Sequence, residues 1–297
     1  MRHDPSRPAV APADDQQALD AVVQLLDLEP IEVNIFRGVS PEDRMQRVFG
    51  GQVAGQALVA AARTVDDGSR VHSLHAYFLR PGDPKVPILY TVDRIRDGRS
   101  FTTRRVVAIQ HGRAIFNLAA SFQVDEDGYE HGLPMPDVPP PESLPDWQAQ
   151  WASVADLAPD RFGRPRAIDL RYVTGAPPSR VGTSSTRQQV WLRAAGRLPD
   201  DPVLHTCLLT YASDMTLLDT ALLPYGTSAL DESIQMASLD HAMWFHQPFR
   251  ADTWLLYDQE TPAASGGRGL TRGSVFRRDG TLVASVVQEG LVRRRRR

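Results

Sequence analysis

Hydrophobic and polar positions change period along the first half of the chain. Residues 16–28 place apolar side chains at helical spacing and predict a short helix, whereas residues 31–36 alternate as a strand does. Residues 48–65 are apolar nearly all round, which predicts a helix buried on every side. Turn signals then separate strand-like runs at 70–80, 86–96, 100–110 and 113–124. A long helix followed by antiparallel strands is typical of an α+β domain.

The same order of elements returns after a proline-rich stretch. Proline cannot join a sheet ladder, so residues 129–165 are expected to form an extended linker. Beyond it the pattern predicts strands near 168–174 and 187–195, a helix over 202–221, and strands over 235–247, 252–260, 267–278 and 281–292. We therefore assign residues 16–128 to an N-terminal unit and residues 166–292 to a C-terminal unit.

Identities at a nearly constant spacing indicate that the two units are copies of each other. Matches 168 positions apart join Thr103-Arg104 to Thr271-Arg272, Val107 to Val275 and Gly112 to Gly280, and a match 166 positions apart joins His75-Ala76 to His241-Ala242. Two such units joined edge to edge would form one continuous sheet and cover two exposed strand edges. We expect two tandem units, each with a central helix wrapped by an antiparallel sheet.

Composition and charge narrow the class of protein. A chain of 297 residues with 42% hydrophobic content can bury two cores. The net charge of -3 argues against nucleic acid or an anionic membrane as partner. The chain shows no signal-peptide pattern and no membrane-span pattern, and together with the single cysteine, Cys207, this favours a cytoplasmic location. Residues 1–15 and the arginine run 293–297 are expected to be disordered or solvated tails.

Several familiar enzyme signatures are missing. The nearest approach to a nucleophile elbow, residues 98–102, lacks the final glycine, which disfavours a serine-nucleophile hydrolase. The glycines at 267, 269 and 273 fail the dinucleotide-binding spacing, so no cofactor is implied. His72 and His75 lie three apart on a predicted strand and therefore point to opposite faces. We predict no metal site.

Three polar residues occur in segments that otherwise look buried. Asp214 follows Ser213 at the start of the apolar run MTLLDTALL, where a helix dipole would favour a carboxylate and lower its pKa. Ser238 lies within the strand pattern QMASLDHAMWF, and Gln288 follows the apolar run LVASVV. A capping carboxylate, a small strand residue and an edge glutamine are the ordinary structural interpretations of these residues.

Five longer sequence segments are more specific evidence than these three single residues. They are RVFGGQVAGQAL from Arg47, VHSLHAYFLRPGD from Val71, SLDHAMWFHQPF from Ser238, WLLYDQETPAASGGRGLTRG from Trp254 and DGTLVASVVQEG from Asp279. With them the chain resembles the acyl-CoA thioesterase II family, apart from its termini and linker. The resemblance implies a double-hotdog fold, hydrolysis of fatty acyl-CoA, and a catalytic trio on Asp214, Ser238 and Gln288. Some family members have threonine where Ser238 stands, and serine keeps the hydroxyl.

The resemblance also predicts which unit carries the chemistry. The alignment of the two units places Gln52 opposite Asp214, Ser73 near Ser238 and Ala120 opposite Gln288, so that only the second unit holds the trio. The first unit is expected to shape the acyl tunnel or to supply backbone donors from Gly50-Gly51 at its helix start. The candidates for substrate contact are Gly50, Gly51, His75, Asp240 and Arg268, and strand alternation places Asp240, not His241, on the face of Ser238. The candidates for holding the CoA phosphates are Arg104, Arg105, Arg268 and Arg272.

Thioester chemistry fits this set of residues. A thiol leaves readily, so hydrolysis needs only an activated water, with Asp214 as general base and a backbone N–H stabilising the oxyanion. A catalytically inactive acyl-CoA-binding module is one alternative. A hotdog enoyl-CoA hydratase is another, but it needs a histidine where Asp219 stands. The resemblance also implies a homodimer or homotetramer with acyl-CoA as the small-molecule partner.

Overall fold

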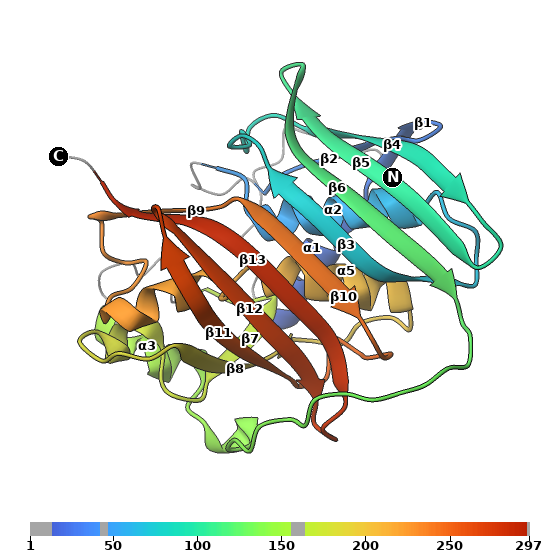
Figure 1. Cartoon of the computed structure of the whole chain (residues 1–297). Helices are drawn as coiled ribbons and strands as arrows, with labels where there is room; N and C mark the ends of the chain where they lie inside the picture. The colour runs from blue at the N-terminus through green and yellow to red at the C-terminus, as the bar shows by residue number, and fades with distance from the viewer. Residues whose placement is uncertain (1–13, 42–46, 156–163, 296–297) are drawn as a thin grey trace.

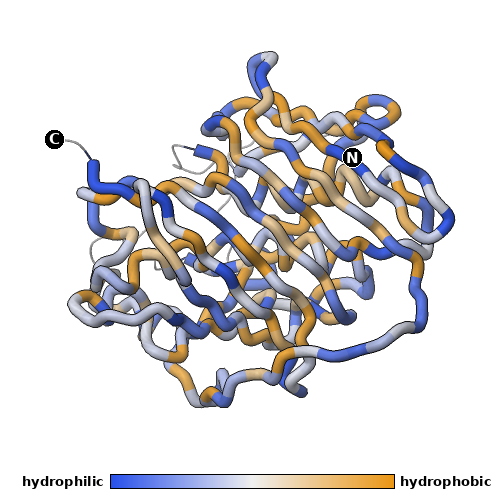
Figure 2. The backbone as a smooth tube through the Cα atoms, in the orientation of Figure 1, coloured by the Kyte–Doolittle hydropathy of each residue, from blue (hydrophilic) through white to orange (hydrophobic). Residues whose placement is uncertain are grey.

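The computed structural model describes residues 14–41, 47–155 and 164–295. Within them a 13-stranded sheet forms one continuous layer, with α1 (Asp15–Leu26), α2 (Gly50–Ala62) and α5 (Pro202–Ser213) behind it (Figure 1). Hydrophobic and hydrophilic residues alternate along many of its strands (Figure 2), as expected for a sheet with one face on a core. None of the helices in the described ranges is long and apolar enough to cross a membrane.

The strands of the two units follow each other in mirrored order across the sheet. The first unit supplies β1 (Glu29–Glu32), β2 (Ile35–Gly38), β3 (Ser69–Phe78), β4 (Ile88–Asp97), β5 (Phe101–Gln110) and β6 (Arg113–Val124). The second supplies β7 (Ile168–Tyr172), β8 (Arg187–Ala194), β9 (Ile234–Ser238), β10 (Asp240–Phe245), β11 (Leu255–Ser265), β12 (Arg268–Arg277) and β13 (Leu282–Arg294). Their order is β1-β2-β4-β5-β6-β3-β10-β13-β12-β11-β8-β7, with β9 also paired to β13. The units therefore meet at β3 and β10, as the edge-to-edge arrangement predicts.

The two central helices pack against each other at glycines. In α2, every residue from Gly51 to Ala61 is buried, which agrees with the all-round apolar pattern. A Cβ atom on Gly51 would lie 2.2 Å from the Tyr211 carbonyl oxygen, and one on Gly55 would lie 3.3 Å from the Cys207 carbonyl oxygen. The contacting residue numbers rise along α2 while they fall along α5, so the two helices are antiparallel. The N-terminus of α2 consequently lies beside the C-terminal end of α5.

The sequence alignment of the two units is out of register in two strands. Arg104 is 1% exposed and faces the core, whereas Arg272 has a side chain that is 60% exposed. His75 is exposed on the outer face, whereas His241 is buried. Because side chains alternate along a strand, equivalent residues must share a face. The spacing of 168 therefore fails for Arg104 in β5, and the spacing of 166 fails for His75 in β3. Thr271, 167 positions after Arg104, shares its inward orientation.

Four segments differ from the expected elements. The strand expected at 31–36 is a hairpin of β1 and β2, whose turn holds Asn34 at a φ of 62°. The helix expected over 202–221 ends at Ser213, and a 3-10 helix, η3 (Leu218–Tyr225), follows it. The linker is not wholly extended, because it contains η1 (Pro141–Ser143) and α3 (Trp147–Ala155). A third short 3-10 helix, η2 (Pro177–Arg180), lies between β7 and β8.

The two predicted tails fall partly outside the described residues. Residues 1–13 are outside them, and α1 begins at Asp15. Residues 296–297 are also outside, but Arg293 and Arg294 continue β13 instead of leaving the sheet. They pair with Gln235 and Ile234 of β9, so backbone pairing outweighs the repulsion of adjacent like charges there.

Candidate functional site

Asp214, Ser238 and Gln288 come together on the inner side of the sheet. Asp214 is the C-cap of α5, Ser238 ends β9, and Gln288 lies on β13. The Gln288 Nε2 atom donates to Asp214 Oδ1 at 2.6 Å and to Ser238 Oγ at 2.8 Å. Ser238 Oγ donates to the same Asp214 oxygen at 3.2 Å. The three side chains therefore form a closed hydrogen-bonded triangle.

A strand irregularity at Leu239 turns Ser238 toward this triangle. Ser238 pairs with Gly290, whereas Ala242 pairs with Val287, so the register on β13 shifts by one residue between β9 and β10. Such a bulge re-aims the side chains that follow it. His241 rather than Asp240 therefore shares the inner face with Ser238, and the expectation from simple alternation was wrong.

Asp214 does not start a helix, as the sequence suggested, but follows the last residue of one. Its backbone is helical at the C-cap of α5, with φ -82° and ψ -4°. The helix N-terminus that faces its carboxylate belongs to α2, in the other unit, and the Gly51 backbone forms a hydrogen bond with it. A Cβ atom on Gly50 would lie 2.6 Å from Asp214 Oδ2, so only glycine fits there.

Burial dominates the electrostatics of Asp214. Removal from water raises the pKa of its carboxyl to about 6, although hydrogen bonds from Gln288, Ser238 and the Gly51 backbone act in the opposite direction. The expectation that a helix dipole would lower the pKa below its ordinary value was wrong, because desolvation outweighs the donors. A carboxylate with a pKa near 6 is charged at neutral pH and still able to accept a proton.

The N-terminus of α2 has no cap from its own N-cap residue. Its N-cap residue is Phe49, which provides no side-chain hydrogen bond. The first N–H groups of a helix have no partner within the helix, and they carry the positive end of its dipole. The structure thus brings the Gly50-Gly51 segment of the first unit to the triangle of the second.

A buried amide network supports the loop that follows Asp214, and the sequence had not suggested it. Gln188 Nε2 donates to Gln259 Oε1 at 2.7 Å and to the Thr216 carbonyl at 3.3 Å. Gln259 Nε2 donates to Thr216 Oγ1 at 2.5 Å. The available signal was that Gln188 and Gln259 both occur in strand-like segments rich in apolar residues.

The other candidates for substrate contact lie apart from the triangle. His75 is on the outer face, where its ring packs edge-on against Trp244, with ring centres 5.1 Å apart. Asp240 accepts a hydrogen bond from the Glu289 backbone, and Arg268 donates to the Glu289 carboxylate at 2.9 Å. His75, Asp240 and Arg268 therefore do not contribute to the triangle.

The candidate phosphate ligands are already engaged within the chain. Arg105 pairs with Asp93 and Arg272 pairs with Glu260 on the sheet surface. Arg104 is buried and hydrogen-bonds to Thr64 through both the hydroxyl and the carbonyl oxygen.

The first-unit residues do not reproduce the triangle. Gln52 lies near the start of α2, whereas Asp214 lies past the end of α5, so the two are at opposite ends of corresponding helices. The C-cap of α2 is Arg63, which is the structural counterpart of Asp214. Ala120, like Gln288, is buried on the inner face.

Comparisons with known proteins match both units of the chain. Residues 169–291 match the family model for acyl-CoA thioesterase, and residues 40–123 match the model for the acyl-CoA thioesterase N-terminal domain. Acyl-coenzyme A thioesterase 8 of Mus musculus is 45% identical over 285 residues, which cover 92% of this chain and 88% of that protein. Acyl-CoA thioesterase 2 of Haemophilus influenzae is 40% identical, with 93% and 98% covered.

Solved structures show the same similarity. The crystal structure of an acyl-CoA thioesterase II from Mycobacterium marinum is 49% identical, covers 92% of this chain and 98% of that one, and gives a TM-score of 0.77. A protein of unknown function with a hot dog fold from Alicyclobacillus acidocaldarius, at 20% identity and a TM-score of 0.76, shows the fold alone. The double-hotdog fold is confirmed, and the chain belongs to the acyl-CoA thioesterase II family of thioester hydrolases.

Proposed function

We propose that this chain hydrolyses fatty acyl-CoA to free fatty acid and CoA at the triangle of Asp214, Ser238 and Gln288. The observation that carries the proposal is the half-buried Asp214 carboxylate. Its pKa near 6 suits a general base at neutral pH, and its Oδ1 atom accepts hydrogen bonds from both Ser238 and Gln288. The names of the relatives support acyl-CoA as the substrate class.

The chemistry follows from the positions of these groups. A water that enters beside Asp214 replaces part of the internal hydrogen bonding of the triangle and is then held by Ser238 and Gln288. Asp214 removes a proton from this water as the water oxygen attacks the thioester carbonyl carbon. The carbonyl oxygen becomes an oxyanion. As the carbonyl re-forms, the carbon–sulfur bond breaks and the CoA thiolate leaves, after which it takes up a proton. A thiol with an ordinary pKa near 8.5 leaves without further activation, so the reaction needs no covalent intermediate.

The oxyanion requires donors that are already in place. The N-terminus of α2 fits this requirement, because Phe49 leaves it without a side-chain cap and Gly50 and Gly51 allow close approach. The first unit would then contribute backbone donors while the second contributes the side chains, which gives one site for each chain. A cytoplasmic location and a homodimer or homotetramer stay predictions from the sequence.

Release of free thiol from purified protein and acyl-CoAs of several lengths tests this proposal. Asp214→Asn should lower kcat by roughly 10²- to 10⁴-fold, because it removes the base. Asp201→Asn, at the other end of α5, keeps a capping side chain and should leave kcat unchanged. Normal turnover by Asp214→Asn would contradict the assignment. Binding of acyl-CoA by the wild type without thiol release would support an inactive binding module instead.

A further inference from the structure

We infer that His241 is a positioning residue that holds the Gln288 amide in the orientation needed to donate to Asp214 and Ser238. This inference rests on the proposed function. It assigns a role to a buried side chain that does not touch the reacting atoms. Three observations carry it: the place of His241 in the sheet, its bond to Ser213, and the two polar atoms that remain once all other hydrogen bonds are assigned.

His241 lies directly behind the triangle. It is 1% exposed and belongs to the inner face of β10. The pairing of Ala242 with Val287 continues by one residue to place His241 beside Gln288 on the neighbouring strand. On its other side, His241 Nε2 is 2.9 Å from the hydroxyl of Ser213, the residue before Asp214. The ring therefore bridges the strand of Gln288 and the helix end that carries Asp214.

The remaining hydrogen-bond partners select one tautomer of this histidine. Both N–H groups of Gln288 point to Asp214 and Ser238, and Gln288 Oε1 is buried without a hydrogen-bond partner. His241 Nδ1 is likewise buried without a hydrogen-bond partner. A proton on Nδ1, donated to Gln288 Oε1, satisfies both atoms at once. In this tautomer the Ser213 hydroxyl donates to the unprotonated Nε2 in place of the Thr210 carbonyl, and both acceptors lie 2.9 Å from its Oγ atom.

Electrostatics agree with a neutral ring in this tautomer. Burial lowers the pKa of His241 to about 4, and an interaction with Gln288 acts in the opposite direction, as a donated Nδ1–H would. At neutral pH the ring is uncharged and has a single N–H to give. The groups packed around it are Ser213, Met243 and Gln288, with Asp214 one residue beyond Ser213.

Fixing the amide matters because glutamine has two nearly isosteric orientations. If the Gln288 amide were turned over, its oxygen would face the Asp214 carboxylate, and two acceptors would repel each other. The donor of His241 opposes this flip, since a flipped amide would place an NH₂ group against Nδ1–H. His241 thus determines which atom of the Gln288 amide faces Asp214 and Ser238. Outer partners orient the ligands of a metal site in the same way.

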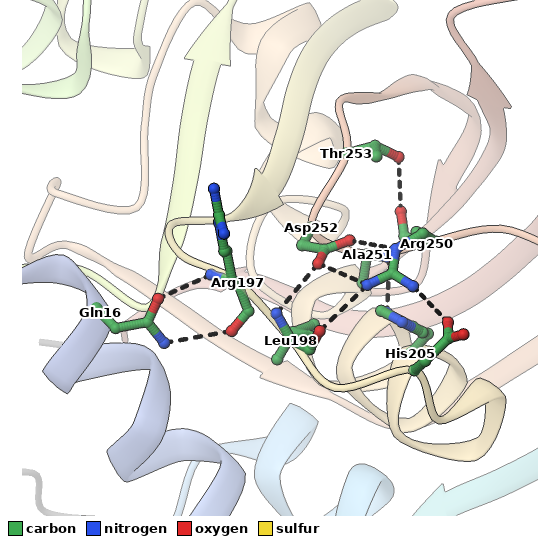
Figure 3. Close-up of polar contacts among 9 residues, drawn as sticks. Gln16, Arg197, Leu198, His205, Arg250, Ala251, Asp252 and Thr253 are labelled. Carbon is green, nitrogen blue, oxygen red and sulfur yellow. Dashed lines mark hydrogen bonds and ion pairs between the residues drawn. The ribbon is translucent and has the colours of Figure 1, made fainter.

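Substitutions that distinguish the N–H donor of His241 from the volume of its ring test this role. His241→Leu fills the space without a donor, whereas His241→Asn returns an N–H near the position of Nδ1. His205→Leu is the matched control: His205 is a buried histidine near the opposite end of α5, where its Nδ1 accepts the Ala251 N–H within the polar cluster of Figure 3. For each variant, kcat, KM, the pH dependence of kcat/KM, and Tm are measured with one acyl-CoA, alongside Asp214→Asn.

The expected pattern is specific to positioning. His241→Leu should lower kcat by roughly 10- to 100-fold with KM little changed. It should also move the acid limb of kcat/KM upward, because the Gln288 hydrogen bond that lowers the pKa of Asp214 is weakened. His241→Asn should recover most of kcat, and His205→Leu should lower Tm while folded protein keeps wild-type kcat.

Three results would overturn the inference. They are wild-type kcat in His241→Leu, equal losses of kcat in the Leu and Asn variants, or an unmoved acid limb in His241→Leu. If any of these results is found while Asp214→Asn is inactive, the role of His241 is rejected and the proposed function still stands. Normal turnover by Asp214→Asn removes the proposed site itself.

Discussion

At each end of the α2–α5 helix pair, the N-terminus of one helix lies beside the C-cap of the other, but the side chains at the two ends differ in charge. At one end the N-terminus of α2 has no side-chain cap and faces Asp214, the C-cap of α5. At the other end Asp201 caps α5 by accepting from the Val203 and Leu204 N–H groups. The residue in the position of Asp214 there is Arg63, which is bonded to Asp27 and to the Leu28 carbonyl. The N-terminus of α2 thus meets a carboxylate from the other unit, through the Gly51 backbone, whereas the N-terminus of α5 is capped by its own N-cap residue.

The sheet beside each helix end differs in the same sense. Next to Asp214 the inward residues of β12 and β13 include Thr271 and Gln288, and Thr271 Oγ1 donates to the Gln288 carbonyl. In the first unit the corresponding strands place Arg104 and Ala120 inward. Arg104 fills this space and bonds to Thr64, just past the end of α2. The two copies of the scaffold therefore differ in the side chains that face the helix ends: Thr271 and Gln288 in the second unit are replaced by Arg104 and Ala120 in the first.

Removal of Arg104 should have the largest effect on stability and none on chemistry. Arg104→Met leaves the Thr64 hydroxyl and carbonyl and the Arg96 carbonyl without their donor, so we expect a loss of about 3 kcal/mol in the free energy of unfolding. Denaturant unfolding measures the loss, and thiol release measures kcat. A large fall in kcat of the folded variant would show that the first-unit end takes part in catalysis.

Gly51→Ala should act at the site end. Its Cβ atom would lie 2.2 Å from the Tyr211 carbonyl oxygen and 2.6 Å from Phe49, so the start of α2 must move away from Asp214. A displacement of that kind should lower kcat by about 100-fold. Gly128→Ala, where a Cβ atom meets nothing within 4 Å, is the control and should behave as wild type. Equal activity of the two variants would remove α2 from the site.

Ser238 should tune the pH dependence of the reaction. The base works as a carboxylate, so kcat/KM should fall as pH drops through about 6, the pKa of Asp214. Ser238→Ala removes a hydrogen bond that lowers this pKa; the acid limb should therefore move upward, and kcat should fall roughly tenfold. Ser238→Thr keeps the hydroxyl and should restore both. An acid limb that stays in place in Ser238→Ala would contradict the shared hydrogen bond.

The smallest effect is expected at the capped end of α5. Asp201→Ala removes the acceptor for two backbone N–H groups and should lower the free energy of unfolding by about 1 kcal/mol. The activity of the folded protein should not change. Thermal unfolding and thiol release at one temperature measure both quantities, and a loss of kcat larger than the loss of folded protein would tie this end to the reaction.

Sequence patterns predicted the repeated α+β units and brought out Asp214, Ser238 and Gln288 as polar residues in apolar surroundings. They misjudged details that depend on register. A bulge at Leu239 adds one residue and turns His241 inward. The pattern of hydrophobic residues in the sequence does not reveal this bulge. The helix end that faces Asp214 comes from the other unit, which local sequence cannot show. The burial that raises the pKa of Asp214 is likewise a property of the packed helix pair.

The central claim is that the substrate carbonyl binds between Asp214 and the N-terminus of α2. The most direct test is to locate a bound substrate carbonyl. A crystal structure with a non-hydrolysable acyl-CoA, in which a methylene group separates the sulfur from the carbonyl, would show this. We predict one ligand for each chain, with its carbonyl carbon beside Asp214 and its carbonyl oxygen within hydrogen-bond distance of the first N–H groups of α2. A carbonyl bound at the Asp201 and Arg63 end, or at both ends, would contradict the account.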